Sequence, residues 1–384
     1  MADRIVEITR TGYLGNLKKA LAGFLFGLLF IVGSFFLLSW NEGNSVKTHA
    51  SLDWAEAEVK PATPEQITPA LEGRVIHLAG DTTAPQAIRD GMFGFEVPDA
   101  LRLYRKVEMY QWVEHKSSRD RETMTGGTES RTTYTYTKEW SETAHNSNDF
   151  REPQGHQNPA MPAHSEKQNA HGVMLGAYAV GNDVLALLEN FTRPIVPQPQ
   201  DGYGVHGELL YKGAAPENPQ VGDMRVTFAA VPADAISIIG QQSGNKVVDA
   251  TSPNGRSVLL VEAGMQDAKA MFTRAHTTAS LITWGLRAAG VFLMYLGFML
   301  VLAPLRAVIA FVPGLRWIVG IGLSLVSLCL ALLLAGGTIA VAWFAYRPLL
   351  SAGVLGAAVL VTVFVAFARR GRTPTAADPV VQRF

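Results

Sequence analysis

Residues 21–40 read LAGFLFGLLFIVGSFFLLSW, and this stretch decides the class of the protein. It contains no charged side chain, and a helix of that length, rising about 1.5 Å per residue, matches a hydrocarbon core of roughly 30 Å. Lys18 and Lys19 precede this stretch, and we predict that it is an uncleaved membrane anchor. A cleaved signal peptide is the alternative, but the run is longer than a usual signal-peptide core and no small-residue cleavage motif follows it.

Three further apolar stretches near the other end of the chain predict three more transmembrane helices. They cover residues 279–303, 317–345 and 349–368. Only a few residues separate the last two, which should therefore form an antiparallel hairpin. The piece between the second and third spans, 304–316, is too short to cross a bilayer and is expected to lie in its interface. The predicted fold class is a membrane protein with four transmembrane α-helices, one before and three after a large extramembrane domain.

The Lys and Arg residues that flank these spans predict their orientation. They are Arg10, Lys18, Lys19, Arg306, Arg316, Arg369, Arg370 and Arg372. Flanks rich in basic residues stay in the cytoplasm, so we expect residues 1–20, 304–316 and 369–384 inside. Residues 41–278 are then expected on the luminal or periplasmic side, and Arg347 is the single charge that disagrees.

The composition excludes some partners and bonds. The chain has 384 residues, and its 33 Lys and Arg balance its 33 Asp and Glu. Nucleic acid is not expected among its partners, because binding to phosphates depends on clustered positive charge. The single cysteine, Cys329, lies in an apolar run, which excludes an intrachain disulfide and a cysteine-based zinc site and indicates a packing role.

Residues 41–278 read as an α+β domain rich in β-structure. Short segments of alternating apolar and polar residues, bounded by Gly, Pro and Asn, are typical of strands. These segments are 73–80, 104–113, 131–140, 224–230, 236–241 and 257–261. Helical patterns occupy 64–71, 173–191 and 266–276. Residues 117–131 indicate a hairpin tip, and 146–169 is expected to be a loop outside the core.

One strand of this domain carries candidates for chemistry. Glu108, Tyr110, Trp112 and Glu114 alternate along it and should share one exposed face. Two carboxylates on one face can act as general acid and base or bind a cation, and a solvated strand face explains them equally well. The chain contains no serine-hydrolase, zinc-protease or nucleotide-binding signature. We therefore predict no catalytic residue and no enzymatic activity.

Four histidines fall in or near the loop-like region. His145, His156, His164 and His171 are spaced by 11, 8 and 7 residues, which matches no helical pair of metal ligands. His156 lies in the sequence GHQNP, where a turn held by side chain to backbone hydrogen bonds is the simpler interpretation. No metal site and no cofactor are predicted.

The spans themselves carry candidate contact residues. Arg287, beside Trp284, lies a turn or two inside the outer boundary of the second span. Its side chain either extends to the headgroups or pairs with a carboxylate that docks the domain, and Arg347 is a further candidate for docking or lipid contact. Small residues allow a neighbouring helix to approach closely and so predict packing positions. These positions are Gly290, Gly320, Gly336, Gly353 and Gly356.

Seven short blocks in the chain resemble one protein family, in the family's order. They are WNEG at 40–43, EGRVIH at 72–77, VEMYQWVE at 107–114, GHQNP at 155–159, VGDMRV at 221–226, TWGLRAAG at 283–290 and WFAYRPL at 343–349. Over about residues 21–366 the chain thus resembles the transmembrane protein 43 (LUMA) family. No block is a catalytic signature, and the resemblance supplies no catalytic residues.

The resemblance implies a four-span protein that organises membrane protein complexes and self-associates. Its eukaryotic relatives reside in the endoplasmic reticulum and inner nuclear membrane, and a bacterial relative would lie in the bacterial inner membrane. We expect a non-enzymatic multi-pass scaffold whose partners are membrane lipids, other membrane proteins and further copies of itself. The alternative is a lipid- or ion-binding protein with a pocket at the junction of domain and membrane, lined by Arg287, Arg347 and a carboxylate such as Glu108.

Overall fold

The computed structural model describes residues 4–123, 127–305 and 315–346. Within these ranges the chain divides into two compact units. The sheet unit consists of residues 4–19 and 47–281, and the helix unit consists of residues 20–46, 282–305 and 315–346. The predicted fourth span, 349–368, and the tail, 369–384, lie outside the described residues.

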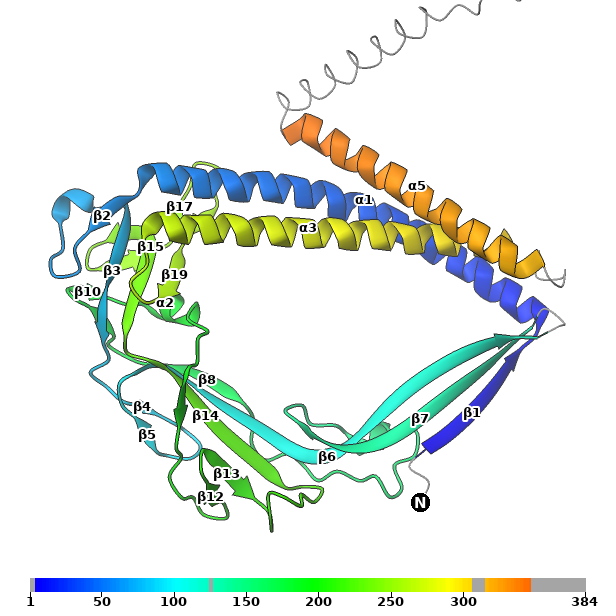
Figure 1. Ribbon diagram of the computed structural model, residues 1–384, viewed down its shortest axis with the longest axis horizontal. Coiled ribbons are helices and arrows are strands. Elements are labelled where there is room, and N and C mark those ends of the chain that lie inside the picture. The colour runs from blue at the N-terminus through cyan, green and yellow to red at the C-terminus, as the bar shows by residue number, and fades with distance from the viewer. Residues whose placement is uncertain (1–3, 124–126, 306–314, 347–384) are drawn as a thin grey trace, which may run out of the picture. The chain divides into compact units, whose positions relative to one another are not determined.

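The larger sheet of the sheet unit is antiparallel and has eight strands. These are β1 Arg4–Thr11, β6 Ala100–Glu122, β7 Thr128–Ser141, β8 Glu166–Asn169, β11 Arg193–Ile195, β12 Gly204–His206, β13 Leu209–Lys212 and β14 Met224–Pro232. The order is β1-β7-β6-β14-β13-β12, with β8 on β6 and β11 on β14. β6 and β7 form a long hairpin, in which Met109 pairs with Ser141 and Glu122 with Thr128 (Figure 1).

The second sheet has seven strands. These are β2 Lys60–Ala62, β3 Val75–Thr83, β9 Met174–Leu175, β10 Tyr178–Ala179, β15 Ala235–Ser243, β16 Lys246–Val248 and β19 Leu260–Ala263. β15 is central, because Ile238 pairs with Leu78 of β3 and with Val261 of β19. Two short ribbons also occur, β4 Ile88–Arg89 with β5 Glu96–Val97 and β17 Ala250–Thr251 with β18 Ser257–Val258.

The main hydrophobic core takes side chains from both sheets. Leu78 and Ile238 of the seven-stranded sheet and Leu103 of the eight-stranded sheet are each at most 1% exposed. Phe95 packs edge-on against Phe228, with ring centroids 4.7 Å apart. Burying one such side chain contributes about 1.5–3 kcal/mol. The alternation of these residues along each strand therefore decides which face of the sheet is buried.

The strands predicted from alternation are confirmed. The six predicted segments fall in β3, β6, β7, β14, β15 and the pair β18 and β19, and the hairpin tip lies between β6 and β7. The strands of the hairpin reach closer to its tip than expected, since β6 ends at Glu122 and β7 begins at Thr128.

Two of the predicted helices in the domain are wrong. Residues 173–191 contain only the short helix α2, Asn182–Ala186, together with β9 and β10, because Gly176, at φ +58°, turns the chain between these two strands. Residues 64–71 contain only a 3-10 turn, Pro69–Leu71. The stretch 146–169 also differs from expectation, since Met161 and Ala163 are buried in the core.

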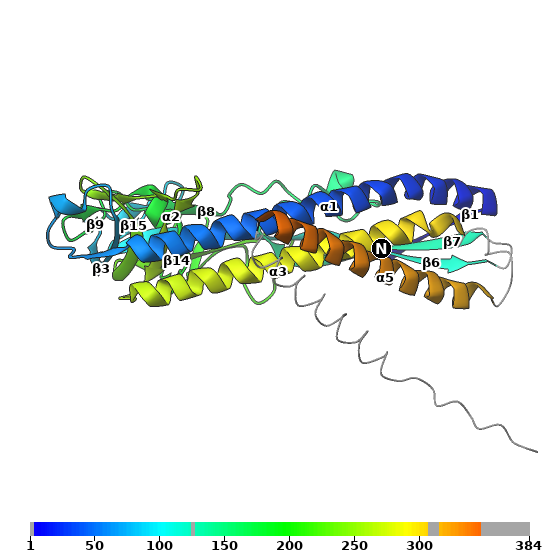
Figure 2. The same ribbon diagram turned by 90° about the horizontal axis from the view of Figure 1, so that it is seen from above.

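Among the described residues, three long helices carry apolar stretches. α1 Tyr13–Glu58, α3 Ala268–Val301 and α5 Leu315–Tyr346 are long and apolar enough to cross a membrane. In the helix unit, the residues of α1 and α3 lie side by side (Figure 2), and Leu38, Met294 and Ala331 from the three helices form a fully buried cluster. A membrane protein with a large β-rich domain, as predicted, follows from these elements.

Both α1 and α3 extend beyond the predicted spans. The first span was expected to end at residue 40, but α1 continues to Glu58, and α3 begins at Ala268 rather than at 279. In the sheet unit, Leu52 and Ala55 of α1 share a buried cluster with Phe272 of α3. Their three-residue spacing places them on one helix face. Hydropathy therefore located the apolar part of each helix and not its ends.

The N-terminal segment also differs from expectation. Residues 1–20 were predicted to be a separate cytoplasmic segment, but residues 4–11 form β1, the edge strand beside β7. The pairing covers eight residues, from Arg4 with Thr135 to Thr11 with Thr128. The alternation in the sequence RIVEITRT is typical of a strand. The segment is short, however, and the apolar stretch 21–40 follows it closely.

Candidate functional site

A buried carboxylate, Glu42 of α1, joins the three long helices. Its side chain is only 2% exposed. Arg287 of α3 donates two hydrogen bonds to it, from Nε to Oε1 at 2.6 Å and from Nη2 to Oε2 at 2.8 Å. Trp343 of α5 donates from Nε1 to Oε2 at 2.8 Å. We call Glu42, Arg287 and Trp343 the three-helix cluster.

Neighbouring residues fix the geometry of the three-helix cluster. The Arg287 guanidinium lies 4.6 Å from the ring centroid of Trp284, which precedes it by nearly one turn of α3. It also lies 5.9 Å from the ring centroid of Trp343. Asn41 Nδ2 donates a hydrogen bond to the carbonyl oxygen of Thr283 at 3.1 Å, which joins α1 to α3 a second time. The arginine is therefore held between two indole rings and one carboxylate.

The chemistry of the cluster is that of a specific ion pair. Removing two charges from water is costly, and their attraction offsets that cost only when the geometry is good and their hydrogen bonds are satisfied. Here a planar guanidinium faces both carboxylate oxygens, the arrangement that gives charged hydrogen bonds their strength and direction. Such a pair favours one arrangement of the three helices over any other.

Glycines bring α1 and α3 into close contact within the helix unit. A Cβ atom on Gly27 would lie 2.7 Å from the carbonyl oxygen of Gly297, and one on Gly297 would lie 2.9 Å from the carbonyl oxygen of Gly27. A Cβ atom on Gly290 would lie 2.6 Å from a methyl group of Leu38. These three positions therefore accept no side chain without moving the helices apart.

A cavity of about 420 Å³ lies next to the cluster, between α3 and α5. Its lining is mainly apolar and consists of Trp284, Arg287, Ala288, Val291, Phe292, Tyr295, Leu328 and Ile339. Tyr295 is also tied to α5, since its hydroxyl lies 2.8 Å from that of Ser324. The cavity is open to its surroundings, and Arg287 is the only charged residue among those that line it.

The residues predicted to dock the domain or to pack between spans occupy different kinds of position in the structure. Arg287 pairs with Glu42 and stacks on Trp284, so the carboxylate that it meets is on α1. Gly290 is a packing position, Gly320 is half-buried, and a Cβ atom on Gly336 would meet nothing within 4 Å among the described residues. Arg347, Gly353 and Gly356 lie outside the described residues, and their roles stay predictions.

Sequence reasoning missed Glu42, Trp343, Gly27 and Gly297. Glu42 was predicted only as part of the extramembrane domain, 41–278, yet it is the acidic residue nearest to the first span. An arginine inside an apolar helix requires a counter-charge. The pair Glu42 and Arg287 could therefore have been found from the sequence by asking which carboxylate lies nearest to a span.

The strand face predicted on β6 is half-buried rather than exposed. Glu108 lies opposite Arg225 of β14 and accepts a hydrogen bond from its Nε at 2.7 Å, and Lys106 Nζ lies 3.2 Å from the same carboxyl group. Arg225 lies over the ring of Trp140, 4.5 Å from its centroid, and Tyr110 packs against that ring at 5.3 Å. Burial alone would raise the pKa of Glu108, but the hydrogen bonds from Arg225 and Lys106 lower it below its ordinary value.

The other end of this face is covered by the histidine-containing loop. His156 is 2% exposed and stacks on Tyr136 at 3.9 Å between ring centroids, with Trp112 edge-on at 4.7 Å. Its Nδ1 lies 3.0 Å from the carbonyl oxygen of Glu152, the side chain to backbone contact expected of this turn. Burial, together with the hydrogen bond to Glu114, raises the pKa of Tyr136 to about 12. Glu114 and Trp112 therefore help to attach the loop to the sheet.

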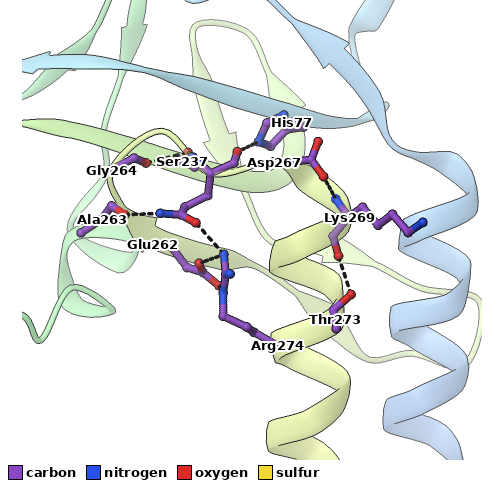
Figure 3. A network of polar contacts seen from close by, with 10 residues as sticks. His77, Ser237, Glu262, Ala263, Gly264, Asp267, Lys269, Thr273 and Arg274 are labelled. Carbon is purple, nitrogen blue, oxygen red and sulfur yellow. Dashed lines mark hydrogen bonds and ion pairs between the residues drawn. The ribbon is translucent and has the colours of Figure 1, made fainter.

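A polar network fastens the beginning of α3 and the residues just before it to the seven-stranded sheet (Figure 3). The backbone N–H of Gln266 donates to Ser237 Oγ at 2.8 Å, and Ser237 Oγ donates to the carbonyl oxygen of Gly264 at 2.8 Å. Arg274 on α3 pairs with Glu262 of β19, its Nε donating to Oε1 at 3.0 Å. The start of α3 is therefore fixed to strands β15 and β19.

Comparison with known proteins finds one family along nearly the whole chain. The family model described as transmembrane protein 43 matches residues 109–348. The human transmembrane protein 43 is 32% identical over 381 residues, covering 95% of this chain and 94% of the relative. The chain belongs to the transmembrane protein 43 family.

The relationship extends beyond vertebrates. The transmembrane protein 43 homolog of Drosophila melanogaster is 32% identical over 347 residues, covering 86% of this chain and 90% of the relative. No solved structure matches the chain. The range matched by the transmembrane protein 43 family model includes Arg287 and Trp343, so two of the three residues of the three-helix cluster lie in its part of the chain.

Proposed function

We propose that this chain is a non-enzymatic multi-pass membrane scaffold, an integral membrane protein that holds protein complexes together through its helices and presents its β-rich domain outside the cytoplasm. The observation that supports this role most is the three-helix cluster. Its two charges bind each other at 2.6 and 2.8 Å, which serves to position helices. A rigid helix unit is what a platform for other membrane proteins requires.

The outer surface of α5 supports contacts with further copies or other membrane proteins. Among the described residues, Cβ atoms added to Gly322, Gly336 and Gly337 would meet nothing within 4 Å. Leu333 and Val341, on the same helix, are 73% and 72% exposed. Small residues between large apolar ones allow a neighbouring helix to approach closely in a bilayer. We therefore propose self-association through α5, with membrane lipids covering the remaining apolar surface.

The test is chemical crosslinking of the full-length protein in native membranes, followed by solubilisation and mass spectrometry. We expect discrete oligomers or a recurring protein partner. Gly336→Leu should reduce the crosslinked fraction severalfold, because a Cβ atom at this position would meet no described residue within 4 Å and leaves it open to a second copy. Gly285→Leu on α3, which also has open space around it, is the matched control and should leave the oligomers intact.

A lipid-binding role is the second candidate, and the cavity between α3 and α5 is the observation that favours it. It has less support, because the guanidinium of Arg287 already binds Glu42. Native mass spectrometry separates the two proposals. A monomer that retains one lipid per chain, and loses it in a Phe292→Trp variant that fills the cavity, would favour lipid binding over the scaffold.

We also propose the membrane in which the protein resides in each type of host. In a eukaryotic cell we place the protein in the endoplasmic reticulum and inner nuclear membrane, and in a bacterium in the inner membrane. Fluorescence microscopy of a tagged chain in each host tests the assignment, and a signal at the plasma membrane of a eukaryotic cell would contradict it.

A further inference from the structure

The three strands β1, β7 and β6, which lie side by side in Figure 1, gather arginines on one face of the sheet. Residues that lie directly opposite one another in the register share a face, as do alternate residues along each strand. The rows on one face are Arg4–Thr135–His115, Val6–Thr133–Ser117, Ile8–Arg131–Arg119 and Arg10–Glu129–Arg121. These four rows hold five arginines and one glutamate, so this face of the sheet is strongly basic.

Three of these arginines surround a hollow of about 440 Å³. The residues that line it, which we call the arginine hollow, are Arg4, Ser117, Arg119, Arg131, Thr133 and Thr135. Among the side chains that the structure describes, none forms an ion pair or hydrogen bond with the three guanidinium groups. Glu129, the glutamate on this face, instead accepts a hydrogen bond from Arg10 Nε at 2.9 Å. The arginine hollow therefore contains positive charge without a counter-charge.

The arrangement of two of these arginines is unfavourable by itself. Arg119 and Arg131 lie directly opposite one another on β6 and β7, where Cβ atoms are about 5 Å apart and like charges destabilise the pair. An anion between the guanidinium groups would remove this repulsion. A guanidinium group matches the oxygens of a phosphate in geometry as well as in charge, and Thr133 and Thr135 supply hydroxyl donors beside it. The arginine hollow is therefore suited to a phosphate group.

The opposite face of the same strands is occupied by the protein itself. Tyr134 is buried there, and Lys116 lies over its ring, 5.7 Å from the centroid. Arg151, from the stretch 146–169, donates from Nη2 to Glu7 Oε1 at 3.1 Å and so joins that stretch to β1. The two faces therefore differ in kind, since one is packed against the rest of the sheet unit and the other carries the arginines outward.

Exposed apolar residues lie among the arginines and point to the kind of partner. Val6 and Ile8, on the same face of β1, are 37% and 55% exposed. A soluble anion makes no use of apolar side chains, whereas the interface of an anionic membrane binds basic and apolar residues together. Only residues 12–20 separate β1 from the apolar stretch 21–40, so the chain keeps β1 close to a membrane surface.

We propose that the arginine hollow binds the phosphate of an anionic phospholipid headgroup, with Val6 and Ile8 against the adjoining part of the lipid. The charge of the surface is complementary to that of the lipid, and its apolar residues fit the boundary between headgroups and acyl chains. This contact belongs to the sheet unit and goes beyond the scaffold function, which rests on α5 and the three-helix cluster. Either proposal can therefore fail without the other.

Titration of the full-length protein in a neutral detergent tests the arginine hollow. The reporter is a polarity-sensitive dye on Ile8→Cys in a Cys329→Ser background, which removes the single native cysteine. The probes are dihexanoyl-phosphatidylglycerol, dihexanoyl-phosphatidylcholine and inorganic phosphate. We expect the phosphatidylglycerol to bind most tightly. Arg119→Gln should weaken its affinity about fivefold, the factor that corresponds to roughly 1 kcal/mol for one basic residue beside anionic lipid.

The matched control is Lys116→Gln, because Lys116 is also exposed on β6 but lies on the opposite face. It should leave the affinity unchanged. Equal affinities for the two lipids would overturn the proposal. Binding of inorganic phosphate with no preference between the lipids would also overturn it, and would show that a soluble anion occupies the hollow.

The same dye tests the contact in a bilayer. In phosphatidylcholine nanodiscs, adding phosphatidylglycerol should shift the emission from position 8 to the blue, and about 1 M salt, with a screening length of about 3 Å, should reverse the shift. A dye on Thr9→Cys, on the opposite face of β1, should show no shift. Emission from position 8 that is the same with and without phosphatidylglycerol would contradict the proposal.

A double variant separates loss of binding from loss of folding. Arg119→Gln with Arg131→Gln should abolish the shift at position 8. Its melting temperature in detergent without anionic lipid should equal or exceed that of the parent, because the change removes the repulsion between two opposed arginines. A double variant that stays folded and retains the full shift would show that these arginines do not hold the lipid.

Discussion

Glu42 is nearly inaccessible to water, and its charge is balanced by one arginine from another helix. Changing Glu42→Gln leaves Arg287 in place without a counter-charge. Breaking a buried pair in this way costs roughly 3 kcal/mol or more. We therefore expect the melting temperature of the full-length protein in detergent to fall clearly, and Arg287→Leu to lower it as well, because the carboxylate is then left unpaired.

The control for this prediction is another ion pair on the same helix. Arg274 pairs with Glu262, and its side chain is 49% exposed, so Arg274→Gln should lower the melting temperature much less than either change in the buried pair. The double variant Glu42→Gln with Arg287→Leu should be destabilised by less than the sum of the two single changes, since the two residues interact directly. Additive effects would show that the pair contributes nothing specific.

Glu108 predicts a pH dependence of the sheet unit. Its pKa in the folded protein is lowered through hydrogen bonds from Arg225 and Lys106 that outweigh its burial, so folding favours the ionised form. Its contribution to stability is therefore present above the ordinary carboxyl pKa of 4.5 and is lost as the pH falls through the lower folded value.

The measurement is the melting temperature between pH 7 and pH 3. Glu108→Gln should lower it at pH 7, by an amount corresponding to about 1–3 kcal/mol for a hydrogen bond to a charged group, and should reduce the further loss on acidification. Glu96→Gln, at an exposed position on β5, is the control and should leave the curve unchanged. A variant curve parallel to the wild-type curve at every pH would contradict the role of Glu108.

At the scale of elements, the contact between α1 and α3 depends on two glycines. Alanine normally stabilises a helix by about 0.5–1 kcal/mol relative to glycine. At Gly297 the added Cβ would lie 2.7 Å from Ile31 and 2.9 Å from the backbone of Gly27, so Gly297→Ala should destabilise the helix unit instead. Gly285→Ala on the same helix meets nothing within 4 Å and should be neutral or stabilising. Equal melting temperatures for both variants would show that the helices are not in close contact.

The elements also show what the sequence can predict. β14 was found because alternation reports a strand with one buried face, and β15 because a short apolar run bounded by polar residues is typical of a strand buried on both faces. The apolar parts of α1, α3 and α5 were found because lipid imposes a long uncharged run. The extension of α1 to Glu58 was not predicted, since those residues are polar and only Leu52 and Ala55 mark the packed face. Hydropathy detects only the part of a helix that is apolar enough for lipid. The helix itself continues while its residues pack against other parts of the protein.

At the scale of the whole molecule, the contacts that matter most join residues far apart in the chain. β1 pairs with β7 across more than a hundred residues, and Glu42 meets Trp343 with a sequence separation of 301. No local pattern encodes such contacts. Arg287 and Gly290 could be selected from the sequence because each is unusual in its helix, whereas Glu42 could be selected only by asking which carboxylate lies nearest to a span.

The order of synthesis gives the pairing of Glu42 with Arg287 a consequence. The two residues are separated by 245 positions, and a ribosome that adds about 5–20 residues per second makes the second roughly 10–50 s after the first. During that interval the newly made α1 holds a carboxylate whose partner does not yet exist. In a chain that stops before Arg287, Glu42 of α1 therefore stays without its partner. We expect the cell's quality-control proteases to degrade such a chain.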